Sequence, residues 1–296
     1  MRIGLITYAH PEPFHTAQMD VVAGTLAALG TKAEVSRHFG CRDKALLAAE
    51  AERLTAWEPD LIVSFMTNAD IAVIAATVDT PIVCWSMDPI DSGLVKAMAR
   101  PGGRLTGVAF PPGLQMMQLR ALKMLKPATQ RVAMLFNPGY APAAGSLAKL
   151  AAAGGLFGIE IVAYEALTLE AVRAALPAMA ADGCGGLVVG PHELFNQNGL
   201  VIGRLALECG LPTVAMDNIV ECGGTVSFMP DFPRIWDAAA RIANRILKGE
   251  APGAIPFDRH IKPRVTLNLD AARQLGLLLD PIFVDEADRL IGVGGE

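Results

Sequence analysis

The sequence predicts an α/β fold of two lobes, each a doubly wound parallel sheet with helices on both faces. Short apolar segments alternate with Ala- and Leu-rich segments along most of the chain, which is typical of strands and helices following each other. Pro- and Gly-rich stretches at 100–103 and 111–112 then interrupt the alternation, which starts again at Arg131. The length of 296 residues suits two such lobes.

The expected strands are apolar runs, as strands buried on both faces require. In the first half they lie at 3–7, 34–37, 61–65, 81–85 and 105–108. In the second half they lie at 131–136, 160–163, 186–189, 213–216 and 225–228. The helical segments between them are 18–29, 45–56, 113–125, 146–153, 169–179 and 199–209.

A further amphipathic helix is expected at 232–247, because Lys248-Gly249 after it is a typical helix end. This helix would return the chain to the first lobe. The first lobe is therefore expected to contain 1–110 and 229–257, and the second 111–228 and 258–296. Hinge crossings near Phe110, Phe228 and Phe257 would join them around a ligand cleft.

Composition excludes several classes of protein. Hydrophobic residues make up 52% and charged residues 19% of the chain, which provides for buried cores and argues against disorder. The net charge of −5, without a run of Lys or Arg, argues against binding to nucleic acid. No apolar stretch reaches the roughly 18 residues that a membrane span needs.

Cysteine and histidine spacing points away from metal sites and catalysis. The five cysteines show no CxxC or Cys/His spacing, so we expect buried thiols and no metal or cofactor. An amino-acid racemase with two lobes would need a thiol at a strand end of each lobe, whereas Cys84 lies inside a predicted strand and Cys184 precedes one. No GxSxG, P-loop or GxGxxG motif is present. We therefore expect a protein that is not an enzyme.

Polar or aromatic residues follow six of the predicted strands, where ligands of open parallel sheets bind. These strand ends are Tyr8-Ala9-His10-Pro11, Met66-Thr67-Asn68, Ser86-Met87-Asp88-Pro89, Asn137-Pro138, Pro191-His192-Glu193 and Asp217-Asn218. Asp, Asn and Pro also form turns, so any one of these residues has an ordinary explanation. The whole set, facing a cleft between two lobes, favours ligand binding.

Several segments resemble the ABC-transporter substrate-binding family that includes the tryptophan- and tyrosine-binding lipoproteins of bacteria. The similar segments are IGLITYAHPEPFH, GLVKAMARPGGRLTGVAF, RVAMLFNPG, GGTVSFMPDF, RIANRILKGEAPGAIPF and TLNLDAARQLGL. They run over nearly the whole chain in the family's order. The resemblance implies the type I periplasmic-binding-protein fold, with two lobes that close on a small molecule by hinge motion.

The resemblance also implies roles for residues of the first lobe. Thr67 and Asn68 match the family's loop at the start of a helix, where a hydroxyl and backbone N–H groups suit a carboxylate. Asp88 matches the family's Asp-Pro and would pair with a ligand ammonium. Tyr8 and His10 would line the first loop. Trp85 would form an apolar wall or belong to the core, and Asp91 is expected to cap a helix over 93–99.

In the second lobe, the resemblance implies that Asn137 reaches toward the ligand and that Asp217 and Asn218 share its cation. His192 is a further candidate. The chain departs from the family at Asn68, where proline is common, and at His192, where an acid is common. These departures leave the ligand open within the class of aromatic and branched amino acids.

The expected function is that of the solute-binding component of an ABC importer, a monomer that meets a permease. A cytosolic ligand-sensing domain of the same fold is the alternative. The chain begins directly with a strand at Ile3. That start fits a periplasmic protein whose signal peptide has been removed, or a cytoplasmic protein.

Overall fold

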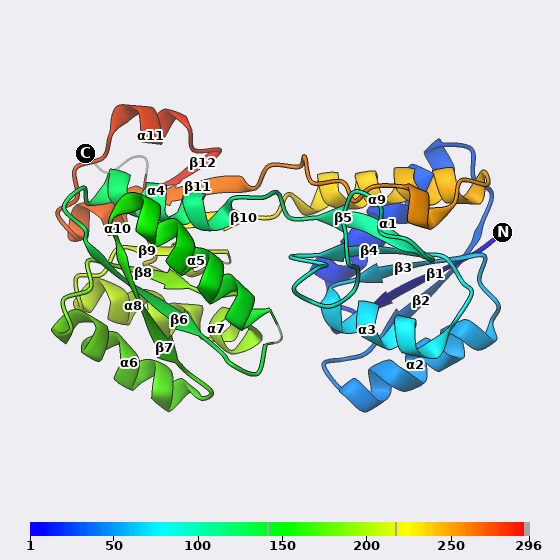
Figure 1. Cartoon of the computed structure of the whole chain (residues 1–296), viewed down its shortest axis with the longest axis horizontal. Coiled ribbons are helices and arrows are strands. Elements are labelled where there is room, and N and C mark those ends of the chain that lie inside the picture. The colour runs from blue at the N-terminus through cyan, green and yellow to red at the C-terminus, as the bar shows by residue number, and fades with distance from the viewer. Residues whose placement is uncertain (141, 217, 293–296) are drawn as a thin grey trace. The chain divides into compact units, whose positions relative to one another are not determined.

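The computed structural model describes residues 1–140, 142–216 and 218–292, in two compact units (Figure 1). Unit 1 contains Met1–Pro111 and Asp231–Lys262, and unit 2 contains Pro112–Pro230 and Pro263–Glu296. Each unit is a sheet with helices on both faces, so the predicted class of two α/β lobes is confirmed.

Unit 1 is built on a parallel sheet of five strands in the order β2-β1-β3-β4-β5. The strands are β1 (Arg2–Thr7), β2 (Glu34–Phe39), β3 (Leu61–Phe65), β4 (Ile82–Ser86) and β5 (Leu105–Ala109). The helices are α1 (Pro13–Ala28), α2 (Lys44–Ala56), α3 (Thr67–Ala76) and α9 (Phe232–Leu247). Figure 1 shows α1 and α9 on one face of this sheet and α2 and α3 on the other. Helix α3 is not among the helical segments expected from the apolar pattern, although the resemblance implied a helix that starts at Thr67.

Helix α9 begins and ends where the sequence predicts. The Asp231 side chain accepts a hydrogen bond from the backbone N–H of Arg234 at 3.3 Å, which caps the first turn. The helix ends before Gly249, which has a φ of 100°. Its buried residues are Ile235, Trp236, Ala239, Ala240, Ile242, Ala243, Asn244 and Ile246. This spacing forms one apolar stripe, which packs on the unit 1 sheet.

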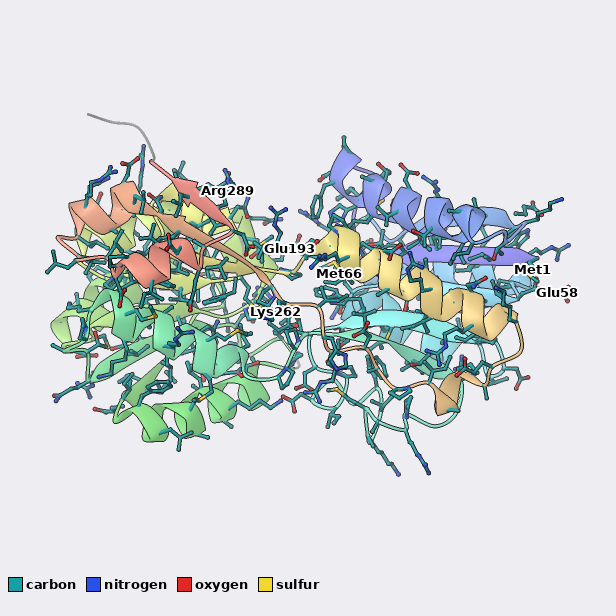
Figure 2. All side chains as sticks on the ribbon, turned by 90° about the horizontal axis from the view of Figure 1, so that it is seen from above. Met1, Glu58, Met66, Glu193, Lys262 and Arg289 are labelled. Carbon is teal, nitrogen blue, oxygen red and sulfur yellow. The ribbon has the colours of Figure 1, made fainter. Side chains whose placement is uncertain are left out.

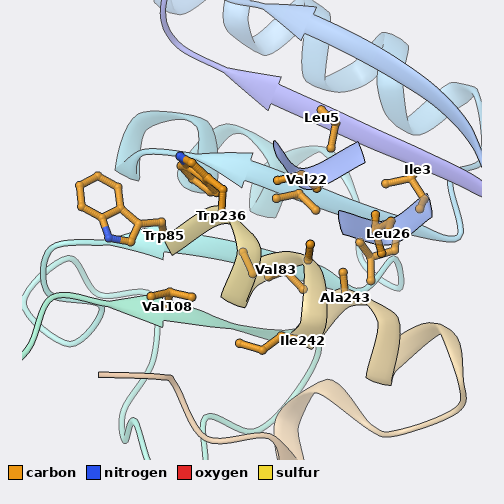
Figure 3. Close-up of a cluster of buried hydrophobic side chains, with 14 of the residues drawn as sticks. Ile3, Leu5, Val22, Leu26, Val83, Trp85, Val108, Trp236, Ile242 and Ala243 are labelled. Atoms are coloured by element: carbon orange, nitrogen blue, oxygen red, sulfur yellow. The ribbon is translucent and has the colours of Figure 1, made fainter. Parts of the chain in front are cut away.

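The core between this face and the sheet is shown in Figure 3. Trp85 lies at one end of the cluster, and Ile3 and Leu26 lie at the other. Trp236 is fully buried, and its indole N–H donates to the Gln18 side chain at 3.0 Å. The core of unit 1 therefore depends on a helix that comes more than a hundred residues after its last strand.

The chain leaves unit 1 for the last time later than the sequence predicts. The expected lobe boundary at 257/258 is wrong, because Asp258 pairs with β5. Its N–H donates to the carbonyl of Gly107 at 2.9 Å, and its carbonyl accepts from Ala109 at 2.8 Å. Residues up to Lys262 therefore belong to unit 1. The other two unit boundaries differ from the expected ones by one and two residues.

Unit 2 is built on a sheet of seven strands in the order β12-β11-β10-β9-β8-β6-β7. The strands are β6 (Arg131–Phe136), β7 (Glu160–Glu165), β8 (Gly186–Val189), β9 (Thr213–Ala215), β10 (Val226–Met229), β11 (Arg264–Asn268) and β12 (Arg289–Ile291). The sequence predicted only the first five. It also predicted an all-parallel sheet, whereas β11 runs antiparallel to β10.

The helices of unit 2 are α4 (Leu114–Leu125), α5 (Ala143–Phe157), α6 (Leu169–Ala181), α7 (Glu193–Gln197), α8 (Gly199–Glu208), α10 (Leu269–Gln274) and α11 (Pro281–Asp285). Two short 3-10 turns are η1 (Asn218–Cys222) in unit 2 and η2 (Pro252–Ala254) in unit 1. Helices α6 and α8 bury Leu176 and Ile202 against the strands, whereas α4 and α5 pack together (Figure 1).

Each of the three segments that connect the units contains proline. They are Pro111-Pro112, Pro230 and Pro263. Proline has a fixed φ and no backbone N–H, so it cannot donate to a sheet at these positions. Sheet pairing is therefore interrupted at each crossing.

One carboxyl group is fully buried in unit 1. Asp70 on α3 is 0% exposed, and the Ser64 hydroxyl donates to its Oδ1 at 2.5 Å. Its Oδ2 has no hydrogen-bond partner among the described residues. Burial raises the pKa of Asp70 well above its usual value, and the Ser64 hydrogen bond opposes this only in part. The folded protein therefore favours the neutral acid.

This burial makes the stability of unit 1 depend on pH. Because the folded pKa of Asp70 lies above the unfolded one, its contribution is most favourable below the unfolded pKa and is lost as pH rises through the folded pKa. Asn is a neutral isostere, so Asp70→Asn should match wild type near pH 4 and be more stable by at least about 1 kcal/mol at pH 8. Urea unfolding followed by tryptophan fluorescence checks this. All three tryptophans (Trp57, Trp85, Trp236) lie in unit 1.

Asp79→Asn is the matched control, since Asp79 is exposed in the same unit. It should shift the stability little at either pH. Parallel pH–stability curves for Asp70→Asn and wild type would contradict the neutral, buried state of Asp70.

Candidate functional site

The carboxyl ends of the unit 1 strands carry the candidate ligand loops. Because β1, β3 and β4 are neighbours in the sheet, the loops that follow them are neighbours at one edge. Figure 2 shows Met66, which follows β3, at the end of unit 1 opposite Met1 and Glu58, which precede strands. The structure therefore brings the candidates Tyr8, His10, Thr67, Asn68 and Asp88 to the same edge.

The loop after β3 leads directly into helix α3. Met66 has a φ of 79°, which is unusual for a residue other than glycine, and its side chain is 43% exposed. Thr67 and Asn68 are the first two residues of the helix, and no side chain caps this end. Backbone N–H groups at a helix start lack partners within the helix and favour an anion. The uncapped N–H groups at this helix start therefore suit a carboxylate.

The loop after β4 is organised by Asp88. Its Oδ1 accepts hydrogen bonds from the backbone N–H groups of Ile90 and Asp91, both at 3.0 Å. The Asp88 carbonyl accepts from Ser92 at 3.0 Å. The predicted helix over 93–99 is wrong, since this segment forms turns and bends. Asp91 therefore caps no helix, and Asp88 holds the turn.

The loop after β1 is held by the loop after β2. The Tyr8 hydroxyl donates to the carbonyl of Arg42 at 2.5 Å, and the Arg42 N–H donates to the carbonyl of Tyr8 at 2.7 Å. Cys41 and Arg42 have positive φ of 46° and 61°, which is strained for two successive residues other than glycine. His10, two residues after Tyr8, is half-buried. The sequence had not singled out Arg42, because positive φ leaves no signal in residues other than glycine.

Trp85 belongs to the core of unit 1, which decides between the two roles expected for it. It is 5% exposed, and its ring lies 5.3 Å from that of Phe232 and 6.4 Å from that of Trp236. Its indole N–H is buried without an acceptor among the described residues. The hydroxyl of the adjacent Ser86 is also buried and has no hydrogen-bond partner among the described residues.

In unit 2, the loops after β6 and β8 meet through aromatic rings. The ring of Tyr140 lies 6.4 Å from that of His192, in an edge-on arrangement. Nδ1 of His192 accepts from the N–H of Leu194 at 3.1 Å and so caps α7. Burial lowers the pKa of His192, so the ring is neutral at pH 7. Asn137 is 6% exposed, and its side chain accepts from the N–H of Gly139 at 2.8 Å.

Tyr140 was not singled out by the sequence, although it follows Asn137 within one turn. Burial raises the pKa of Tyr140 to about 12, so it is a neutral phenol at every physiological pH. Asn218 is exposed at the start of η1. Asp217 lies outside the described residues. The N–H of Tyr140 donates to the carbonyl of Asn137 at 3.1 Å, and the Tyr140 ring faces His192. Tyr140 therefore connects these two candidates.

The described part of the chain shows neither a metal cluster nor a membrane-spanning helix. Within 1–140, 142–216 and 218–292, no cluster of three or more His, Cys, Asp or Glu could hold a metal ion. Within the same ranges, no helix combines the length and the apolar character that crossing a membrane requires. The five cysteines are thiols, and burial raises the pKa of Cys84, Cys184 and Cys209.

Residues 14–291 match the family model described as ABC transporter substrate binding protein. A curated relative, the tyrosine-binding protein of Clostridioides difficile (strain R20291), is 23% identical over 229 residues, which is 77% of this chain. The match spans 66% of that relative, just under two thirds of its length. These relatives are substrate-binding proteins and not enzymes.

Solved structures show the same fold. One is an ABC domain from Streptococcus pneumoniae in complex with L-Trp, with a TM-score of 0.85 and 21% identity over 98% of this chain and 99% of that one. Another is the ligand-free, open structure of a substrate binding protein with adhesive properties from Clostridium difficile. Its TM-score is 0.81, with 20% identity over 98% of this chain and 99% of that one. The fold is that of the type I periplasmic binding proteins.

Proposed function

The chain belongs to the family of ABC transporter substrate-binding proteins, and we propose that it binds a small zwitterionic amino acid, aromatic or branched, for an ABC importer. The observation that carries the proposal is the edge of unit 1. There, an uncapped helix start and a carboxylate on the next strand end lie on neighbouring loops. A zwitterion needs this combination of an anion site and a cation site.

Each end of the ligand has its own partner in this proposal. The ligand carboxylate accepts hydrogen bonds from the N–H groups of Thr67 and Asn68 and from the Thr67 hydroxyl. The Asp88 side chain binds the ligand ammonium. Two backbone N–H groups of its own loop donate to this side chain and hold it in place. Tyr8, His10, Asn137, His192, Asp217 and Asn218 complete the proposed set around the ligand.

The importer role adds a partner and a location to the proposal. The protein delivers its ligand to an ABC transporter permease, and it does so outside the cytoplasmic membrane. The family supports both statements, and the relatives bind tyrosine or are solved with L-Trp.

A thermal-shift screen over the amino acids tests the proposal. At a concentration about a hundredfold above Kd, a true ligand should add roughly 2.7 kcal/mol to the free energy of unfolding. Matched derivatives of the best ligand are the controls: the methyl ester lacks the carboxylate, and the N-acetyl form lacks the ammonium. Both should fail to raise the melting temperature. Equal shifts with the blocked derivatives would rule out recognition of a zwitterion.

A further inference from the structure

Five aromatic rings form a continuous series through unit 1, from the core to the surface. Successive ring centroids are 4.0 Å apart for Phe65–Trp236, 6.4 Å for Trp236–Trp85, 5.3 Å for Trp85–Phe232 and 5.6 Å for Phe232–Phe14. The first three residues are at most 5% exposed, Phe232 is half-buried, and Phe14 is 54% exposed. We call this series the aromatic ladder.

The exposed end of the ladder lies at the ligand edge of unit 1. Trp85 is the last residue but one of β4 and precedes Asp88 by three positions. Phe14 lies in the first turn of α1, which follows the carboxyl end of β1, and Phe232 is the first residue of α9. In Figure 3, Trp85 stands at the end of the core that is farthest from Ile3, the second residue of β1.

From this placement we propose that Phe14 and Phe232 form the subsite for an aromatic side chain of the ligand, which makes Phe14 a residue that determines specificity. The proposal rests on the proposed function, because it assigns the side-chain end of the same amino acid. Phe14 and Phe232 meet at 86°, and Phe232 and Trp85 at 72°. Rings held edge to face by their neighbours offer a rigid, preorganised surface to another ring.

The surroundings of Phe14 suit an apolar guest. The ring of His15 lies 5.1 Å from that of Phe14, and burial lowers the pKa of His15, so this neighbour is uncharged at pH 7. Met66 and Ile90, from the loops after β3 and β4, are 43% and 46% exposed. Large apolar side chains exposed at one edge of a domain often mark a binding site.

Phe14 can be changed without breaking the core, because more than half of it is exposed. Phe14→Leu keeps apolar area and removes the ring. Calorimetric titration should follow tryptophan, tyrosine, phenylalanine and leucine binding to wild type and variant. The ratio of the Kd for leucine to the Kd for an aromatic ligand should fall about 2- to 12-fold. This factor corresponds to the free energy of one aromatic pair. Val78→Ala is the control, since Val78 is 81% exposed and precedes β4. It should leave all four affinities unchanged.

The outcomes separate this proposal from the proposed function. If wild type binds amino acids but Phe14→Leu keeps the same preference, or if wild type binds leucine and no aromatic amino acid, only the subsite is overturned. If wild type binds none of the four, the subsite is overturned, and if it also binds neither isoleucine nor valine, the proposed function is overturned with it. Unchanged binding together with lost uptake would assign Phe14 to the contact with the transporter and would also overturn the subsite.

Discussion

Replacing Asp88 by asparagine is expected to weaken ligand binding by on the order of 2–5 kcal/mol, as for the loss of one member of a buried charged pair. The fold should survive. The amide oxygen of asparagine can still accept the hydrogen bonds that Oδ1 receives from the N–H groups of Ile90 and Asp91. The substitution therefore removes the charge and keeps the turn.

Calorimetric titration of Asp88→Asn against wild type measures this loss. Asp91→Asn is the matched control, because Asp91 is an acid three positions later in the same turn. Its affinity should stay close to that of wild type. Asp88→Ala separates the two roles of Asp88, since alanine also removes the acceptor and should lower thermal stability. Equal affinities for Asp88→Asn and wild type would remove Asp88 from the proposed site.

Replacing Gly107 by alanine is expected to unfold unit 1. Gly107 lies on β5 opposite Cys84 of β4, and a Cβ there would stand 1.9 Å from the carbonyl oxygen of Cys84. The obstacle is strand backbone, which cannot turn away as a side chain can. Gly107 also accepts the hydrogen bond of Asp258, so β5 is fixed from both sides. We expect a loss above about 4 kcal/mol, a large part of the stability of a typical domain.

Gly24→Ala is the matched control in the same unit. Gly24 lies within α1, and nothing stands within 4 Å of the position of its Cβ. Alanine there should stabilise the protein by roughly 0.5–1 kcal/mol, because it reduces the freedom of the unfolded chain. Tryptophan fluorescence during urea unfolding reports both changes, since the three tryptophans are all in unit 1. An unchanged midpoint for Gly107→Ala would contradict the close packing of β4 and β5.

The sequence by itself determined the elements whose signal is local. β3, β6, β8 and α9 begin and end at the predicted residues. Apolar runs have to be buried, and α9 carries its own stripe, cap and stop signal. The candidate ligand residues could also be predicted locally, because the end of an apolar run shows where a strand stops and which residues follow it.

Tertiary structure decided the features that depend on contacts with segments far away in the sequence. The strand state of β11 and β12 comes from pairing with β10 and with each other. The extension of unit 1 to Lys262 depends on Asp258 pairing with β5, across about 150 residues of sequence.

The same holds for the side chains of the site. Asp91 was expected to cap a helix, and only the folded turn shows that its N–H donates to the Asp88 side chain. Phe14 and Phe232 lie 218 positions apart, yet their rings meet at 5.6 Å because α1 and α9 pack on the same face of one sheet. A local pattern specifies whether a residue is in a strand or a helix. Which side chains meet is set by packing between elements, which no local pattern contains.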